Sequence, residues 1–238
     1  MEERFLRTAS IIGEAAQKKL LAARVIIFGV GGVGGYAAEA LARAGVGHLT
    51  LVDNDVISES NINRQIIATH STVGMPKVKA FEARIKDINP TCEVDAKQEF
   101  FLPECEMNYD FSSYDYIVDA VDTVSAKLAL AEIAQKQSVR IISSMGAGNK
   151  LDPLAFEVSD IYKTSVCPLA RAMRSELKKR GVRSLKVVYS KEKAFPRHPS
   201  VAHFFKDGEK APGSISFVPS AVGLIIAGQV VCDLIELI

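Results

Sequence analysis

The stretch Arg24–Gly35, RVIIFGVGGVGG, decides the fold that we predict for this chain. It begins with a short apolar, β-branched run, Val25–Phe28, and Ala-rich helical spacing resumes at Tyr36–Ala44. Between them lie four glycines whose missing Cβ atoms leave backbone N–H groups open to a phosphate: Gly29, Gly31, Gly32 and Gly34. The pattern predicts a strand, a tight turn and a helix whose amino end favours an anion. Because tight turns also use glycine for packing alone, the pattern by itself leaves nucleotide binding open.

A second strand is predicted at His48–Val52, after the break Gly45–Gly47. It ends at Asp53, about 20 residues beyond the glycine turn. In βαβ units that bind dinucleotides, an acidic residue at this point bonds the ribose hydroxyls. Asp53 is therefore the predicted ribose ligand of a nucleotide site.

The residues that follow this strand depart from an ordinary dinucleotide-binding unit. Asp53–Asp55, Ser60–Gln65 and Gly74–Lys77 form a polar, cationic stretch where such a unit would continue into its next helix. Arg64 and Lys77 could reach more phosphates than a dinucleotide needs. The combination of carboxylates, amides and two cations favours a phosphate-rich nucleotide over an irregular surface loop with incidental charges.

The rest of the chain completes an α/β fold, which we predict to be a Rossmann-like, mostly parallel sheet with helices on both faces. Further helices are predicted at Arg4–Leu21, Lys77–Ile88, Ser125–Gln137 and Ser220–Leu237, and further strands at Glu93–Gln98, Tyr114–Ala120, Val139–Ser143 and Ser214–Val218. We divide this single domain into an N-terminal helical arm (1–23), a nucleotide-binding core (24–145) and a C-terminal α+β extension on the substrate side (146–238). A second glycine turn, Ser144–Gly148, is a substrate-side loop or a simple chain reversal.

Asp122 is the predicted metal ligand. It follows the strand Tyr114–Ala120, at the carboxyl end where open α/β sheets keep their ligands. Mg²⁺ prefers one or two carboxylates together with phosphate oxygens and water, and a carboxylate facing nucleotide phosphates suits it. Asp119 lies nearer the strand, and we expect it to cap or turn the chain instead.

The composition is that of an ordinary globular protein, with 48% hydrophobic and 24% charged residues. The four cysteines form no C-x-x-C pair, so we expect neither a structural zinc nor a disulfide framework: Cys92, Cys105, Cys167 and Cys232. A reducing cytoplasm fits this cysteine usage best. The long apolar segment Ala221–Cys232 is shorter than the ~20 residues needed to span a bilayer, and the N-terminus lacks a signal-peptide core. The sequence predicts a soluble protein without a membrane partner.

Charge is strongly segregated along the chain. Residues 163–197 contain eleven Lys or Arg against two acids, a local balance of +9, whereas the whole chain carries +1. The remainder is therefore acidic, with a balance of −8. A basic segment in an acidic protein indicates a polyanionic partner, although a solvated helix face has the same composition.

Five motifs of this sequence, in this order and spacing, resemble those of a known superfamily: GVGGVGGY, LVDNDVISESNINRQ, VGMPKVKA, INP and VDAVD. They look like the adenylation domain shared by ubiquitin-activating enzymes and the bacterial enzymes that adenylate sulfur-carrier proteins, the ThiF-like superfamily. The resemblance covers roughly residues 4 to 145. It implies that a carboxylate attacks the α-phosphate of ATP, giving an acyl-adenylate and pyrophosphate.

The resemblance also assigns roles at the matching positions of this sequence. Asp53 would hold the ribose hydroxyls, and Asn61, Arg64 and Gln65 would bind or orient phosphates. Lys77 would stabilise charge that develops on the phosphate, an electrostatic role that adenylation needs.

Metal and dimer contacts follow from the same resemblance. Asp122, together with Asp55, would hold Mg²⁺. Arg7 resembles the arginine that dimers of this superfamily offer to the partner subunit's ATP, so the resemblance implies a homodimer with Arg7 among its catalytic residues.

Two departures narrow the branch. The chain lacks the zinc-binding C-x-x-C pairs usual in sulfur-carrier enzymes, and it has no room for the cysteine domain of ubiquitin-type activators. Residues 143–181 and the following KVVYSKE instead resemble tRNA threonylcarbamoyladenosine dehydratases. That branch adenylates a carboxylate on a modified tRNA nucleoside, which then closes a ring with net loss of water. The basic segment would then contact tRNA phosphates, and the candidate side chains are Arg171, Arg174, Lys178, Lys179 and Arg180.

Two alternatives stay open. The chain could adenylate the C-terminus of a ubiquitin-like or sulfur-carrier protein, or serve as a nucleotide-binding adaptor that partners a cysteine desulfurase. The missing zinc pairs argue against the first. The retained Asp53, Arg64, Lys77 and Asp122 argue against the second.

A few chemically capable side chains are weighed separately. Cys167 has no nearby base in sequence, and ring closure within the nucleoside makes a thiol relay unnecessary, so we favour a structural cysteine over a catalytic one. We expect Tyr189 and Phe195 to lie in the core rather than stack on RNA bases, and His198 and His203 to be exposed. Residues 195–212 form a loop that could order over the substrate.

Overall fold

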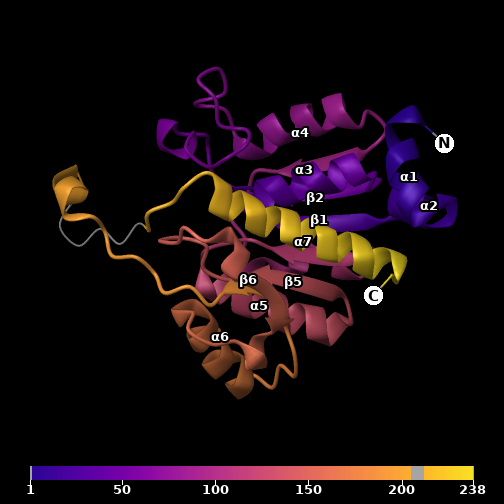
Figure 1. Ribbon diagram of the computed structural model, residues 1–238. Coiled ribbons are helices and arrows are strands. Elements are labelled where there is room, and N and C mark those ends of the chain that lie inside the picture. The colour runs from indigo at the N-terminus through magenta and orange to yellow at the C-terminus, as the bar shows by residue number, and fades with distance from the viewer. Residues whose placement is uncertain (1, 205–211, 238) are drawn as a thin grey trace.

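One β-sheet runs through the whole molecule in the computed structural model, which describes residues 2–204 and 212–237 (Figure 1). Seven strands of this described part of the chain lie in the order β3-β2-β1-β4-β5-β7-β6. They are β1 (Arg24–Phe28), β2 (His48–Val52), β3 (Glu93–Lys97), β4 (Tyr116–Asp119), β5 (Arg140–Ser144), β6 (Phe156–Asp160) and β7 (Lys186–Ser190). The fold class predicted from the sequence, a mostly parallel α/β sheet, is confirmed.

The helices cover both faces of this sheet (Figure 1). The α-helices of the described residues are α1 (Leu6–Ile12), α2 (Glu14–Ala22), α3 (Gly34–Ala44), α4 (Lys77–Ile88), α5 (Val124–Gln137), α6 (Pro168–Lys179) and α7 (Phe217–Ile235). Short 3-10 turns stand at Glu3–Phe5, Glu59–Asn61, Pro103–Asn108, Phe111–Ser113, Pro153–Ala155, Ile161–Lys163 and Pro199–Phe204. The predicted N-terminal helix is split in two, because Gly13 adopts φ +85° between α1 and α2.

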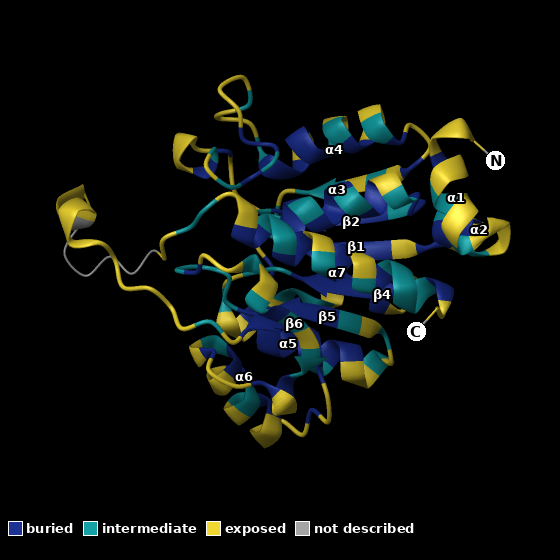
Figure 2. Cartoon of the chain, in the orientation of Figure 1, coloured by how far each residue is buried: buried dark blue, intermediate teal, exposed yellow. Residues whose placement is uncertain are grey.

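Alternation along β1 explains the two layers. Val25 and Ile27 belong to a buried cluster with residues of α3, α4 and α7, whereas Ile26 and Phe28 point the other way and pack with residues of α5. Successive side chains of a strand face opposite sides of the sheet, and here both sides are apolar. Val25–Phe28 of β1 are therefore buried on both faces, and Figure 2 shows this part of the strand in dark blue between the helix layers.

The parallel register brings the carboxyl ends of the central strands to one edge. β1 pairs in parallel with β2 on one side and with β4 on the other, so that Phe28 lies beside Val52 and Asp119. The strand order reverses direction between β1 and β4, and ligands of open α/β sheets bind outside the carboxyl ends at such a point. The fold thus directs attention to the turns that follow Phe28, Val52 and Asp119.

The C-terminal part differs from the predicted elements. No strand forms at Ser214–Val218, so that prediction is wrong: α7 begins at Phe217 and tolerates Pro219 in its first turn. Two strands that we did not predict, β7 and β6, extend the sheet, with β6 running antiparallel at the edge. The alternation in Ser214–Val218 is local, and helix packing outweighs it.

Helix α7 begins three residues before the predicted helix Ser220–Leu237 and ends two residues before its end, so it contains the whole apolar segment Ala221–Cys232. It has 19 residues, and an 18-residue window within it has a mean hydropathy of 1.9, enough by length and composition to cross a membrane. Of that window, 44% is buried within the molecule. It packs closely on α3, because a Cβ at Gly223 would lie 2.3 Å from the Val33 carbonyl oxygen. This contact explains the small residue at the helix crossing.

Candidate functional site

A cavity of about 650 Å³ opens at the edge that the parallel register points to. Its walls come from the turns after β1, β2 and β4, from the amino end of α4 and from the segment before α7. Ten of the residues predicted from the sequence line it: Gly29, Gly31, Gly32, Asp53, Asp55, Asn61, Arg64, Gln65, Lys77 and Asp122. Residues separated by almost a hundred positions in the sequence therefore share one site.

The glycines of the turn have different tasks. Gly31 and Gly32 line the cavity, and a Cβ on Gly31 would meet nothing nearer than 3.6 Å. Gly29 adopts φ +81°, and its added Cβ would lie 2.7 Å from the Ala120 carbonyl oxygen. Gly34 does not line the cavity; its added Cβ would lie 1.9 Å from the Gly29 carbonyl oxygen. The turn thus needs Gly29 and Gly34 for its own geometry, and it presents Gly31 and Gly32 to a ligand.

Gly34→Ala is expected to destabilise the protein by about 3 kcal/mol, because the Gly29 carbonyl must move to admit a methyl group. The matched control is Gly228→Ala on α7, where an added Cβ meets nothing within 4 Å. There alanine should stabilise by up to about 1 kcal/mol, since it is the better helix former. Urea unfolding of the two variants measures both effects. Equal stabilities of the two variants would contradict the packing role of Gly34.

Asp53 organises the floor of the cavity. Its side chain is 9% exposed, and its two oxygens accept hydrogen bonds from the backbone N–H groups of Val30 and Asp55, each at 2.9 Å. Burial raises the pKa of Asp53 from its ordinary value, and the nearby Lys77 ammonium opposes that rise. The carboxylate therefore ties the glycine turn to the loop after β2, and its remaining lone pairs can accept from a bound hydroxyl.

Lys77 is a buried cation at the first residue of α4, 5% exposed. Its Nζ lies 2.6 Å from Asp55 Oδ2 and 3.9 Å from Asp53 Oδ1. Two carboxylates thus balance the charge of the ammonium. Asp55, one of the two predicted Mg²⁺ ligands, is already engaged by this ion pair.

The amides and Arg64 form a second wall. Asn61 Oδ1 accepts from the Ser58 backbone N–H at 3.1 Å, which closes a capping box on the short turn Glu59–Asn61. The Arg64 guanidinium donates to the Ser60 carbonyl oxygen at 3.0 Å and to Asn63 Oδ1 at 2.9 Å. Gln65 is 6% exposed, and its Oε1 has no hydrogen-bond partner among the described residues.

These features fit a nucleotide. A buried polar atom without a partner, such as Gln65 Oε1, is uncommon and calls for an explanation. It lines a cavity that also holds the open backbone at Gly31 and two cations, Arg64 and Lys77. A ligand with several phosphates and polar groups would complete the hydrogen bonds of this wall and match its charge.

Asp122 is exposed at the edge of the cavity. Its carboxylate accepts a long hydrogen bond, 3.4 Å from the Thr123 hydroxyl, and within the described chain it has no ion-pair partner, so most of its acceptor capacity is free. In the described part of the chain no three His, Cys, Asp or Glu side chains gather into a metal-binding group. The donor set thus fits a cation that takes one carboxylate together with a ligand's phosphate oxygens, as Mg²⁺ does.

Sequence reasoning missed two parts of the site. Glu99, Phe100 and Phe101 line the cavity from the segment after β3. Because β3 lies parallel to β2, the chain leaving its carboxyl end reaches the same edge, and this signal required the strand order. The other omission is Lys127, which forms a buried ion pair with Asp119 and follows Ala126, a residue of the cavity wall. Asp119 was predicted only as a cap or turn residue.

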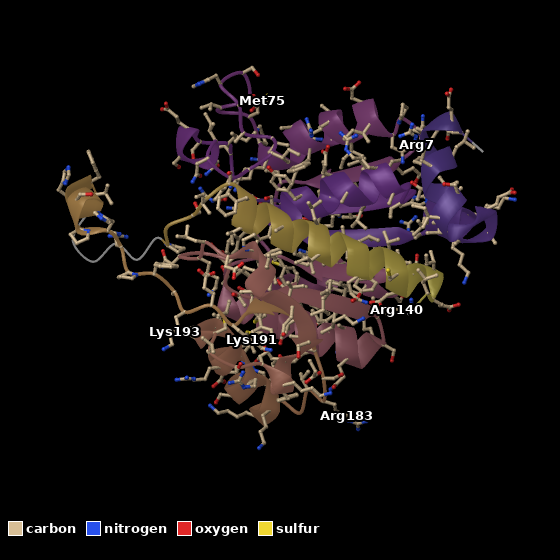
Figure 3. All side chains as sticks on the ribbon, in the orientation of Figure 1. Arg7, Met75, Arg140, Arg183, Lys191 and Lys193 are labelled. Atoms are coloured by element: carbon tan, nitrogen blue, oxygen red, sulfur yellow. The ribbon has the colours of Figure 1, made fainter. Side chains whose placement is uncertain are left out.

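Several predicted residues lie elsewhere. Arg7 is exposed on α1, at the opposite end of α4 from Met75, which marks the cavity side (Figure 3). The basic candidates lie on α6 and directly after it, and none of them lines the cavity. The glycine turn Ser144–Gly148 contributes Ala147 and Gly148 to the cavity wall and so lies on the ligand side.

The chemically capable side chains outside the main motifs are partly buried in the core and partly exposed. Cys167 is 3% exposed, packs in the core beside α6 and does not line the cavity. Tyr189 is 1% exposed, as predicted, whereas Phe195 is 51% exposed, so its predicted core position is wrong. His198 and His203 are exposed as predicted. Of the loop at 195–212, residues 205–211 lie outside the described residues.

Known proteins resemble this chain in both sequence and fold. The model described as the ThiF family matches residues 3–236. A Bacillus subtilis protein named tRNA threonylcarbamoyladenosine dehydratase is 42% identical over 244 residues, which cover 99% of this chain and 96% of that protein. Crystal structures of Escherichia coli tRNA N6-threonylcarbamoyladenosine dehydratase in complex with ATP and with AMP each match with a TM-score of 0.88 and 32% identity, covering 98% of this chain and 94% of that chain.

Proposed function

Because this chain belongs to the ThiF family, we propose that it is an ATP-dependent tRNA threonylcarbamoyladenosine dehydratase. The observation that carries the proposal is the cavity itself. It joins an open glycine turn, two cations and a free carboxylate in a chain that matches the ATP-bound structure of such an enzyme over 98% of its length. The substrate is then N6-threonylcarbamoyladenosine in tRNA, and the products are its cyclic form, AMP and pyrophosphate.

The reaction proceeds in two steps. A carboxylate oxygen of the threonylcarbamoyl group attacks the α-phosphorus of ATP, the bond from this phosphorus to the bridging oxygen breaks, and pyrophosphate leaves. A nucleophile of the same nucleoside then attacks the acyl carbon and loses its proton, the ring closes, and AMP leaves with the carboxylate oxygen that attacked phosphorus. Since nucleophile and acyl group belong to one molecule, their effective molarity is high and no enzyme thiol is needed.

The chain's own residues supply binding and electrostatic stabilisation. Gly31 and Gly32 offer backbone N–H groups to the phosphates, Asp53 accepts from the ribose, and Arg64 with Lys77 balances charge on the phosphoryl oxygens. Asn61 and Gln65 orient the same phosphates. These roles follow the resemblance position by position, and their shared position along one cavity supports them.

Asp122 is proposed to hold Mg²⁺, which would supply further positive charge beside the phosphates. Its free carboxylate supports this role. Asp55 would join as a second ligand only after Lys77 turns from it toward a phosphate, because the Lys77 ammonium lies 2.6 Å from Asp55 Oδ2 here.

The reaction is tested with tRNA that carries threonylcarbamoyladenosine, incubated with the protein, ATP and Mg²⁺. Nucleoside mass spectrometry is expected to show loss of the mass of one water molecule, with AMP formed in equal amount. An unchanged nucleoside despite ATP binding would overturn the proposal. If pyrophosphate exchange instead required a sulfur-carrier protein, the alternative adenylation activity would be correct. Absence of both, with a cysteine desulfurase bound, would support the adaptor alternative.

Phosphate contacts to tRNA are proposed for the cations that the fold leaves free. Five basic side chains of the basic segment, residues 163–197, form a hydrogen bond or an ion pair within the protein. The pairs are Arg174 with Thr164, Lys179 with Glu176, Arg180 with Glu132, Lys186 with Asp233 and Lys191 with Glu157. Among the described residues, Lys163, Arg171, Lys178, Arg183 and Lys193 have exposed side chains without such a partner. Lys193 lies at the start of the segment that extends from the body after β7, and Arg183 lies at a distance from it (Figure 3). Arg171 and Lys178 are therefore the strongest of the five candidates predicted from the sequence.

The double variant Arg171→Ala/Lys178→Ala is expected to weaken tRNA binding most at low salt, and to lower the slope of log K against log salt by about one for each phosphate that is no longer neutralised. The matched control is Lys18→Ala/Lys136→Ala, which removes two exposed cations outside the basic segment. Filter binding across a salt series measures both. An equal loss of tRNA affinity in the control would mean that tRNA binding depends only on the total charge of the protein.

A homodimer is proposed because Arg7 lies away from the cavity of its own chain. It could act only on a partner's ATP, as the resemblance implies. Exposed apolar side chains on α7, Phe217 at 46% and Leu224 at 52%, offer a surface for a second copy, and Figure 2 shows exposed positions along this helix.

Arg7→Ala and Lys77→Ala are each expected to be inactive alone and to regain activity when the two proteins are mixed and allowed to exchange subunits. Half of the dimers would then be mixed, each with one intact site, so about a quarter of wild-type activity should return. AMP formation measures the recovery. Failure to recover while sedimentation shows exchanged dimers would remove Arg7 from the partner's site.

A further inference from the structure

Beneath the cavity lies a closed network of three buried polar side chains. Asp119 and Ser143 are 0% exposed and Lys127 is 1% exposed. Lys127 Nζ donates to both oxygens of Asp119, at 3.0 and 3.1 Å, and to Ser143 Oγ at 3.3 Å, while the Ser143 hydroxyl donates to Asp119 Oδ2. The network joins the ends of β4 and β5 to the second turn of α5. All of its polar side-chain atoms have partners.

This network also holds backbone of the cavity wall. The Val121 backbone N–H donates to Asp119 Oδ1 at 3.3 Å, and the Ala120 backbone N–H donates to the Phe28 carbonyl oxygen at 2.9 Å. Ala120 also lies against Gly29, where an added Cβ would come within 2.7 Å of the Ala120 carbonyl oxygen. The short turn Ala120–Asp122 is thereby fixed from below by Asp119 and from the side by the glycine turn.

The apolar surroundings make this ion pair unusual. Ile117 of β4 and Ala126 and Leu130 of α5 are buried in the hydrophobic cluster on the face of the sheet that α5 covers, the face to which Asp119 also points. A buried ion pair is weak evidence for stability, because well-packed apolar residues often serve as well. Asp119 lies three residues before Asp122, so the ion pair is placed to fix the backbone conformation that positions Asp122.

We propose that Lys127 is a positioning residue, which acts through the Asp119 carboxylate and the Val121 amide to fix the Ala120–Asp122 turn and so to aim the Asp122 carboxylate into the cavity. The inference rests on the proposed role of Asp122 as the metal ligand. Partners behind a ligating carboxylate typically change metal affinity about tenfold or more when they are removed. Lys127 contributes this effect from a helix that itself offers no ligand.

The test combines backbone exchange with ligand binding. In Lys127→Met, amide hydrogen exchange of a peptide covering 118–124 is expected to rise about tenfold, while peptides from β1 and α3 exchange as in the wild type. ATP affinity, measured by titration calorimetry with and without Mg²⁺, should lose most of its Mg²⁺-dependent gain, about tenfold. The control Lys186→Met removes an ion pair with Asp233 outside the cavity wall and should change neither reading.

A single charge left in the core can prevent folding, so the double variant Asp119→Asn/Lys127→Met removes both charges together. It is expected to fold and to show the same two changes. A folded double variant with wild-type exchange at 118–124 and a wild-type Mg²⁺ gain would overturn the inference.

Asp122→Asn, titrated in parallel, separates this inference from the proposed function. If Asp122→Asn loses the Mg²⁺ gain and the Lys127 variants keep it, the positioning role is wrong and the metal role stands. If Asp122→Asn keeps the gain, the metal role of Asp122 is wrong, and the exchange at 118–124 still decides whether Lys127 fixes the turn. Wild-type exchange there would overturn the positioning role as well.

Discussion

Replacing Lys77 by alanine is expected to lower the rate of AMP formation by about 10²- to 10³-fold. The ammonium is 5% exposed and lies between the Asp53 and Asp55 carboxylates at the cavity wall. Charge that develops on phosphoryl oxygens is stabilised most strongly by a cation that is already placed and little hydrated. A buried lysine on the first turn of α4 meets both conditions.

The control for Lys77→Ala is Lys79→Ala on the same helix. Lys79 is exposed and forms an ion pair with Glu82, three residues on, so its removal should leave the rate unchanged. Both variants are compared by single-turnover AMP formation after circular dichroism confirms their folding. A Lys77→Ala rate close to that of Lys79→Ala would exclude Lys77 from the chemistry.

Asp122→Ala is expected to abolish AMP formation at ordinary Mg²⁺ concentrations, a loss of about 10²-fold or more, since it removes the free carboxylate predicted to hold the metal. Stability should change by less than about 0.5 kcal/mol, because the side chain is exposed and accepts a long hydrogen bond. Activity and thermal unfolding are measured on the same preparation. Loss of activity with an intact fold identifies a functional residue.

Asp95→Ala provides the comparison for Asp122→Ala. Asp95 is an exposed carboxylate on β3 that pairs with Lys97 and does not line the cavity. Its removal should leave both AMP formation and the Mg²⁺ dependence unchanged. Near-normal turnover of Asp122→Ala would remove Asp122 from the metal role, whatever Asp95→Ala shows.

The core of the fold could be read from local sequence. Val25–Phe28, the glycine turn and Tyr36–Ala44 predict a strand, a turn and a helix, and β1 and α3 form there. The helix predicted at Lys77–Ile88 has the bounds of α4. These elements combine strong periodicity with glycine or proline at their ends, so local signals and tertiary packing agree.

The C-terminal third was harder because local pattern and packing disagree there. Ser214–Val218 alternates like a strand, yet α7 begins within it and packs on α3 through Gly223. The edge strand β6 has a mixed exposure pattern, since β7 covers it on one side only. Neither feature is set by a few neighbouring residues.

The candidate site shows the same division. Polar residues that stand directly after predicted strands, such as Asp53 and Asp122, could be placed at the cavity from the sequence. The Asp119–Lys127 pair could not, because nothing in the sequence tells that a lysine of an apolar helix points inward. The free cations of α6 could be separated from the paired ones only once Glu132 and Thr164 were seen beside them.

The most direct test of the proposed chemistry follows an oxygen atom. The carboxylate of threonylcarbamoyladenosine in tRNA is labelled with a heavy oxygen isotope, and the AMP and pyrophosphate formed by the protein are analysed by mass spectrometry. Adenylation of the carboxylate predicts that AMP carries one labelled oxygen and that pyrophosphate carries none, because the attacking oxygen stays on the α-phosphorus. Label in pyrophosphate, or AMP without label while the ring closes, would contradict adenylation of the carboxylate.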